Sequence, residues 1–277
     1  MSLAGRIFHR LWIPALILVL LVTPRGLAAN DTAMFTYDFD EGHNQDYKVK
    51  FTQETFFGTF SSSVFADMEV TEKCVGTTED GKFEMEMTFN KVESSMMWMD
   101  KMQPSTMGDE LTGQSISFVV DSHGEVDDIK ALGYIESWRQ FEGSVNQLVN
   151  GFYPYLPGKE ISKDEEWENS TESDEEGMHV TSNAVYKFSE MKEEKGRNCA
   201  KIEVEIETGI GGINSTPMGE YQTEGSGEGE GEFYYDPADG IVVKIKEKIE
   251  IKMDMTPVSG GDAVETTVTF QVERELL

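Results

Sequence analysis

Seven methionines that fall close together are the residues whose chemistry stands out most in this sequence. Thioether sulfurs are soft ligands suited to Cu(I), provided that three or four of them converge on one point. Methionine is also flexible and polarisable, so it lines cores and adaptable apolar grooves. Because two of the seven alternate with Phe83 and Phe89, core or groove lining is favoured over a metal site. The cluster comprises Met85, Met87, Met96, Met97, Met99, Met102 and Met107, beside Trp98.

Other metal-binding patterns are weak. A zinc site needs clustered ligands, and His43, His123 and His179 lie far apart in the sequence. The acids that begin at Asp121 lack the spacing of a calcium-binding EF-hand loop. Asp121 followed by Gly124 is more typical of a hairpin turn.

No catalytic motif is recognisable. The sequence has no Gly-x-Ser-x-Gly, no His-Glu-x-x-His and no phosphate-binding loop. Its 52 Asp and Glu residues offer many carboxylate pairs for glycoside hydrolysis, but nothing selects one of them. We therefore expect a protein that is not an enzyme and that needs no cofactor.

The N-terminus has the order of a secretory signal peptide. Basic residues at Arg6 and Arg10 precede an apolar run at 11–22, and small residues end the segment at Ala28 and Ala29. The apolar run is too short to span a bilayer of about 30 Å as a helix. We expect residues 1–29 to be removed and the protein to be periplasmic or secreted.

The strong negative charge makes some binding partners unfavourable. The formal net charge of −29 disfavours nucleic acid and anionic lipid head groups.

The sequence contains two cysteines, Cys74 and Cys199. In an oxidising compartment they are candidates for a disulfide, and two separate buried thiols are the alternative.

Hydrophobic residues alternate with polar ones over most of the chain. Segments at 35–39, 83–89, 202–206, 249–255 and 264–272 each place apolar side chains on one face and polar ones on the other. This period of two predicts strands of an antiparallel sheet with one face on a core and one in water. Two polar stretches, 162–177 and 219–231, have the composition of solvent loops.

One segment has the period of a helix. Apolar residues recur at threes and fours from Leu132 to Phe152, and Pro154 and Pro157 follow. This pattern predicts an amphipathic helix over 131–152 that packs on the apolar face of the sheet.

The chain also looks duplicated. Residues 113–130 and 229–246 both show a strand, a turn that begins with Asp and contains Gly, and a second strand. We expect two pseudo-duplicated halves, at about 30–130 and 158–277, with the helix between them.

Together these segments resemble a known family. The matching pieces are YKVKFTQE at Tyr47, LTGQSISFVVDSHGEV at Leu111, YPYLPGKEISKDEEWE at Tyr153 and the end from Gly229 onward. They resemble the DUF6263-type exported bacterial proteins of unknown function, which are similar to the LolA-like lipoprotein-carrier fold. In this sequence the usual Gly-Asp-x-Trp is replaced by Asp164-Glu165-Glu166-Trp167. The resemblance implies a curved sheet whose concave face holds acyl chains.

These observations give one expected structure. We predict a single mostly antiparallel α+β domain over 30–277, in which a curved half-barrel sheet wraps round one central amphipathic helix. An apolar small molecule or lipid would bind the concave face of a monomer. The expected contacts are Phe83, Met85, Met87, Phe89, Met97, Met99, Ile251 and Met253.

Two alternatives stay open at this stage. The chain could be a structural or interaction module of the cell envelope with a fully packed core and a protein partner. It could also bind Cu(I) through the methionine cluster. The sequence does not identify the ligand.

Overall fold

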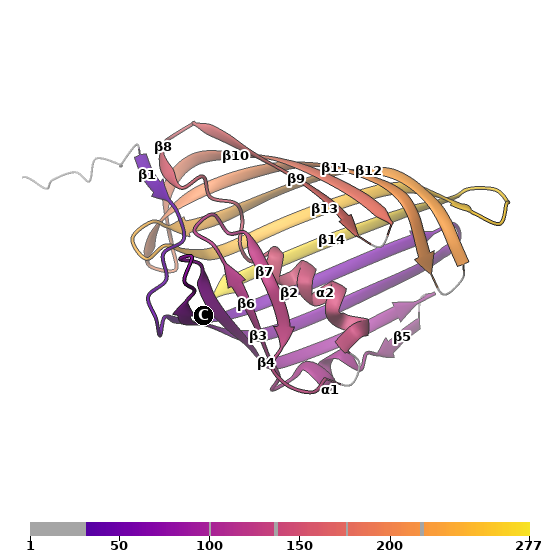
Figure 1. Cartoon of the computed structure of the whole chain (residues 1–277), viewed down its shortest axis with the longest axis horizontal. Helices are drawn as coiled ribbons and strands as arrows, with labels where there is room; N and C mark the ends of the chain where they lie inside the picture. Colours follow the sequence, from indigo (N-terminus) through magenta and orange to yellow (C-terminus); the bar gives the residue numbers. More distant parts are fainter. Residues whose placement is uncertain (1–31, 100, 136–137, 176, 217–218) are drawn as a thin grey trace, which may run out of the picture.

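The computed structural model describes residues 32–99, 101–135, 138–175, 177–216 and 219–277. The expected signal peptide at 1–29 lies outside this range. Most described residues belong to antiparallel strands, which bend into a deep trough (Figure 1). None of the helices in the described part of the chain is long and apolar enough to cross a membrane.

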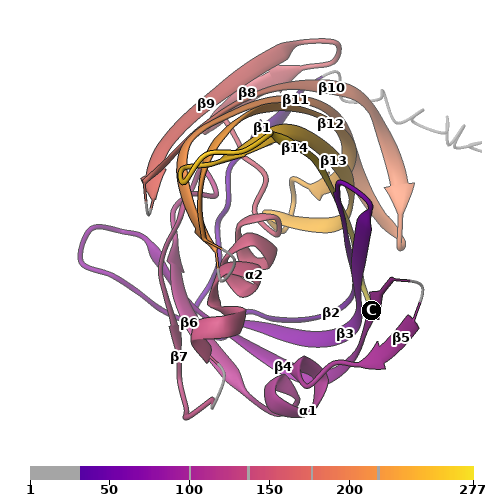
Figure 2. The same cartoon turned by 90° about the vertical axis from the view of Figure 1, so that its right-hand side faces the viewer.

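Twelve strands form one sheet in the order β7-β6-β4-β3-β2-β14-β13-β12-β11-β10-β9, and β5 pairs with β4 beside this path. The first and last strands of the order do not pair with each other, so the sheet is open. Seen from one end, it curves almost into a ring (Figure 2). The sheet strands are β2 (Asn44–Phe57), β3 (Phe60–Thr77), β4 (Phe83–Trp98), β5 (Lys101–Pro104), β6 (Ser115–Val120), β7 (Val126–Ala131), β9 (Glu166–Glu175), β10 (Met178–Glu194), β11 (Arg197–Thr216), β12 (Gly219–Asp236), β13 (Ile241–Pro257) and β14 (Val264–Leu276).

The expected half-barrel around a central amphipathic helix is wrong. The described residues are nearly all β, and the two helices among them are short: α1 spans Met107–Leu111 and α2 spans Trp138–Asn150. The start of the predicted helix is not helical, because Ala131 ends β7 and Leu132 is exposed. The helix α2 lies inside the curve of the sheet, on the side toward β6 and β7 (Figure 2). Buried side chains of α2, such as Val149, share the interior with those of irregular segments, such as Tyr37 and Phe152.

The two expected pseudo-duplicated halves are also absent. The segments that look alike are both hairpins, β6–β7 and β12–β13. The first pair has six-residue strands at the edge of the sheet, whereas the second has strands of 18 and 17 residues in its interior. Any two hairpins share an alternating pattern around an Asp-Gly turn, so the similarity reflects local turn chemistry.

Both polar stretches that were expected to be loops contain strands. Residues 162–177 include β9, an edge strand rich in Glu and Ser. Residues 219–231 belong to β12, which pairs with β11 and β13 along its whole length. Hydrogen bonding to two neighbours therefore overrides the low strand propensity of Gly and Glu in β12.

The glycines of β12 form a stripe on the concave face. Gly225, Gly227, Gly229 and Gly231 alternate with polar residues. On β13 the first three lie opposite apolar side chains, and Gly231 lies opposite Glu247. A Cβ at Gly227 would lie 2.8 Å from Cγ1 of Ile251 and 2.9 Å from the carbonyl oxygen of Glu250. The missing side chains leave room for Ile249 and Ile251 of β13 to lie close over the stripe.

Aromatic side chains close one end of the trough. A two-stranded sheet of β1 (Thr32–Phe35) and β8 (Lys159–Ser162) lies at that end (Figure 1). Phe35 is fully buried and packs against Trp167, Phe188 and Tyr235 at ring-centroid distances of 5.4–5.5 Å. The expected strand at 35–39 ends at Phe35, and the next residues cross the end of the sheet as an irregular segment.

A buried arginine joins the segments that meet in the interior. Arg274 of β14 donates hydrogen bonds to the carbonyl oxygens of Phe152 (2.9 Å) and Val242 (3.0 Å). Its guanidinium lies 4.0 Å from the ring centroid of Tyr47. The Glu72 carboxylate lies 3.9 Å away, and only 2% of either charged side chain is exposed. One side chain therefore connects β14, β13, β2, β3 and the segment after α2.

We expect Arg274→Met to destabilise the fold by about 3–5 kcal/mol, because Glu72 is left as an uncompensated buried charge. Urea unfolding followed by circular dichroism measures this loss. The double variant Arg274→Met with Glu72→Met should recover much of the stability. A double variant as unstable as the single one would show that the guanidinium hydrogen bonds, and not the charge pair, dominate.

We also expect Gly227→Val to cost about 2 kcal/mol or more, because the new side chain has no room beside the backbone of β13. The matched control is Glu228→Val, the next residue along the strand, whose side chain is exposed on the convex face. Thermal unfolding should separate the two variants. Equal melting temperatures would contradict the close packing described for the stripe.

Candidate ligand-binding groove

A groove of about 900 Å³ lies on the concave face of the sheet. Its floor is formed by inward side chains of β10, β11, β13 and β14. One wall consists of the β6–β7 turn and residues 147–155, and the other is the edge strand β9. The groove therefore follows the seam where the two edges of the open sheet face each other. Its volume falls within the range of small-molecule sites.

The floor of the groove is apolar and aromatic. Alternation along each strand directs every second side chain into the trough, and on β11, β13 and β14 these side chains are mostly Val, Ile and Phe. Tyrosines come from β10 and from the segment after α2. The apolar and aromatic lining residues are Tyr153, Tyr155, Tyr186, Val204, Ile206, Phe233, Ile245, Ile249, Phe270 and Val272.

One carboxylate interrupts this floor. Glu247 lies on β13 between Ile245 and Ile249 on the inner face, and its cross-strand neighbours are Gly231 and Val272. It makes no hydrogen bond or ion pair with any residue that the structure describes. Removal from water raises the pKa of Glu247 to about 7. A half-buried carboxylate in such surroundings is a functional-site candidate.

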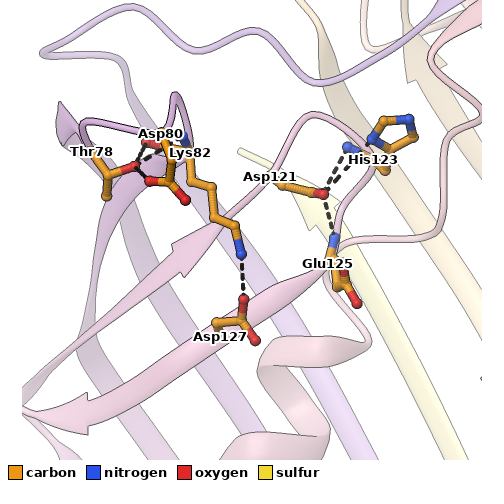
Figure 3. A network of polar contacts seen from close by, with 7 residues as sticks. All are labelled: Thr78, Asp80, Lys82, Asp121, His123, Glu125 and Asp127. Carbon is orange, nitrogen blue, oxygen red and sulfur yellow. Dashed lines mark hydrogen bonds and ion pairs between the residues drawn. The ribbon is translucent and has the colours of Figure 1, made fainter. Parts of the chain in front are cut away.

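The β6–β7 turn in the first wall is held by Asp121. Its Oδ1 atom accepts hydrogen bonds from the backbone N–H groups of His123 (2.8 Å) and Glu125 (2.9 Å), as Figure 3 shows. This confirms the turn predicted from Asp121 and Gly124. The Asp121 carboxylate thus binds the backbone of its own turn. In the described ranges, no group of three or more His, Cys, Asp or Glu residues could hold a metal ion.

A second set of contacts in Figure 3 ties this wall to the body of the sheet. Lys82 Nζ lies 2.6 Å from Oδ2 of Asp127 on β7, although both groups are partly exposed. Thr78 Oγ1 donates to Asp80 at 2.5 Å in the turn before β4. The ring of His123 stacks on Tyr155 with centroids 5.9 Å apart. The stacking on His123 connects Tyr155 to the β6–β7 turn at the edge of the groove.

The eight residues predicted to contact a ligand do not form one site. Phe83, Met85, Met87 and Phe89 are buried in the core. Met97 points to the convex face, where it pairs with Met102, and Met99 is exposed in the turn after β4. Only Ile251 and Met253 are half-buried on the concave face, beyond the groove and toward its open end.

The methionine cluster does not converge on one point. Met85 and Met97 lie near opposite ends of the 16-residue strand β4, at positions about 40 Å apart along an extended chain. Met102 is exposed, whereas Met107 is buried in α1. This spread is typical of core and surface methionines.

The disulfide candidates are both free and buried. Cys74 is on β3 and Cys199 is on β11, and the sheet order places four strands between them. Burial raises the pKa of the Cys199 thiol to about 12. The two cysteines are separate buried thiols in this structure.

Exposed apolar side chains surround the open end of the trough. The hairpin turns after β2, β4, β11 and β13 all lie at this end, because Phe57 pairs with Phe60 and with Thr266, and Pro257 pairs with Tyr221. Figure 2 views the trough from this end. Seven large apolar residues at or near these turns are more than 40% exposed: Phe56, Phe60, Trp98, Met99, Met102, Ile213 and Val258. We call this set the apolar rim.

Sequence reasoning missed Glu247 and the groove tyrosines. Glu247 did carry a signal, since it occupies a position that the period of two assigns to the apolar face of β13. Tyr153 and Tyr155 follow α2, whereas Tyr186 lies on β10, and only the fold brings the two segments together.

No family model matches the sequence, so the expected DUF6263-type membership has no support of that kind. A search for similar curated proteins also finds no match. Among solved structures, the chain is similar to lipovitellin, in a structure that describes lipid–protein interactions, with a TM-score of 0.53 and 11% identity. The match covers 87% of this chain and 25% of lipovitellin, so the chain spans a quarter of that protein. This similarity shows a shared large β-sheet fold.

Two further structures match only loosely. The outer membrane channel DcaP of Acinetobacter baumannii gives a TM-score of 0.18 at 5% identity, over 88% of this chain and all of that one. A DUF3598 protein of unknown function from Nostoc punctiforme gives 0.11 at 8% identity, over 82% and 95%. Neither value supports a conclusion about fold.

We expect Glu247 to make stability depend on pH. Its pKa in the folded protein lies above the ordinary 4.5, so the folded state is favoured while the carboxyl is protonated and loses stability as pH rises from about 4.5 through 7. Glu247→Gln should remove that loss, which is on the order of 2 kcal/mol. Urea midpoints at several pH values measure it. Parallel pH profiles for the two proteins would contradict the assignment.

Proposed function

We propose that this protein binds an apolar or lipid-class ligand in the groove on its concave face and that it does so without catalysing a reaction. The observation that carries the proposal is the groove itself, an open volume of about 900 Å³ over a floor of Val, Ile and aromatic side chains. Apolar area removed from water contributes roughly 25 cal/mol per Å², so an alkyl chain would bind such a floor favourably.

Two further features support the proposal. The fold is shared with lipovitellin, whose structure describes lipid–protein interactions. The apolar rim surrounds the open end of the trough, and contiguous exposed apolar surface commonly marks protein, ligand or membrane contacts.

The proposal includes an exported location. It rests on the basic, apolar and small-residue order of residues 1–29. In the periplasm or outside the cell, a binder of this kind would keep an apolar molecule out of water. Its strong negative charge would keep the protein itself soluble and apart from anionic surfaces.

The direct test is to purify the protein from an exporting host under native conditions, extract it with organic solvent and analyse the extract by mass spectrometry. A stoichiometric apolar molecule supports the proposal. A metals scan on the same sample, with and without copper loading, tests the methionine alternative. Protein that carries neither, and that takes up no fluorescent fatty-acyl probe, would favour an envelope interaction module.

We expect Phe270→Ser to weaken binding of an alkyl probe by about tenfold or more, because it removes a large part of the apolar floor. The matched control is Val75→Ser, an apolar residue of β3 that is 40% exposed outside the groove. Probe titration followed by fluorescence compares the two. Equal weakening by both variants would place the binding surface elsewhere.

A further inference from the structure

Glu247 limits what kind of apolar molecule fits the groove. The carboxylate lies at the floor, within the apolar surface formed by Ile245, Ile249 and Val272. A purely hydrocarbon ligand laid over this floor would cover an ionised carboxylate and leave it without a partner. Such burial is costly unless the charge is paired. The floor is therefore better suited to a ligand that brings its own partner for the carboxylate.

The surroundings of Glu247 favour a positively charged partner. The groove floor near it is aromatic, with the rings of Tyr186 of β10 and Phe233 of β12 in T-shaped contact at a centroid distance of 6.2 Å. Aromatic faces attract organic cations, including quaternary ammonium groups. The whole chain carries a net charge of −29, which raises the local concentration of cations and repels anionic head groups.

The other charged residues that line the groove lie at its walls or point away from its floor. Asp121, His123 and Glu125 belong to the β6–β7 turn, and Glu172 belongs to the edge strand β9. Glu232 and Lys246 alternate with the inward residues of their strands and pair across the convex face. Among the lining residues that the structure describes, Glu247 is thus the acidic group of the floor.

We propose that the groove takes an amphiphile with an ammonium head group, whose nitrogen pairs with Glu247 while its chain lies along the apolar floor toward Ile251 and the open end. This inference rests on the proposed function, which it narrows to a ligand class. The ammonium can belong to a free alkylamine-type amphiphile or to the choline-like head of a zwitterionic lipid.

The test compares probes that share a dodecyl chain and differ in their head group. Dodecyltrimethylammonium, dodecylphosphocholine, dodecyl maltoside and dodecyl sulfate are titrated below their micelle-forming concentrations into the full chain, by calorimetry at about pH 8, where Glu247 is ionised. The expected result is that at least one ammonium probe binds about tenfold tighter than the maltoside, which corresponds to about 1.4 kcal/mol. Tighter binding of phosphocholine would identify the lipid-type head, and tighter binding of trimethylammonium alone would identify the free amphiphile.

The variant Glu247→Gln assigns the preference to this residue. Its affinity for the maltoside should equal that of the unaltered protein. It should lose the preference for ammonium head groups. The matched control is Glu205→Gln, an exposed carboxylate on the convex face of β11. It removes one negative charge from the chain without altering the groove.

The possible failures are distinguishable. If Glu247→Gln keeps the preference, or if Glu205→Gln loses it equally, general charge attraction explains the result and the ammonium inference is overturned. If the maltoside binds but no ammonium preference exists, the head-group inference fails while the proposed function stands. If no dodecyl probe binds the unaltered protein, both fail together.

Discussion

The fold depends on one buried cation. Arg274 is the penultimate inward residue of the last strand, and its guanidinium holds the carbonyl of Phe152, the carbonyl of Val242 and the face of Tyr47 while lying near Glu72. An arginine removed from water needs several partners at fixed positions, and its planar, multi-donor head can engage them together. The interaction therefore fixes where the segment after α2 crosses the trough. That segment in turn supplies the tyrosines of the groove wall.

The curvature of the sheet is permitted by the absence of side chains along one face of β12. A sheet of many strands tends to curl, split or flatten. In this curled sheet, Gly225, Gly227, Gly229 and Gly231 leave the concave face of one strand without side chains. Ile249 and Ile251 of β13 lean over this stripe. The same glycines that lower strand propensity thus permit the bend, and the long ladders on both sides of β12 hold it in place.

Much of the sheet could be predicted from local pattern. Strands such as Phe83–Phe89 and Ile249–Met255 follow strict alternation, which identifies both the element and its two faces. Position in the sheet could not be predicted, because alternation does not say which part of an inner face other segments cover. Met85 and Met87 therefore resemble Ile251 by pattern, yet they lie in the filled half of the trough. The predicted helix at 131–152 begins too early for a related reason. Apolar residues at helical spacing also occur where a short strand and a turn precede a helix.

The open seam and the carboxylate at its floor depend on each other. If β9 paired with β7, the sheet would close, the groove would be sealed and Glu247 would be cut off from water with no described partner. Full burial of an unpaired carboxylate would shift its pKa still further or force it to stay neutral. Both edge strands are short or rich in charged and polar residues, Val126–Ala131 on one side and Glu166–Glu175 on the other, and such edges resist pairing. The charges that keep the edges apart therefore also keep Glu247 within reach of water, or of a ligand that can take the place of water.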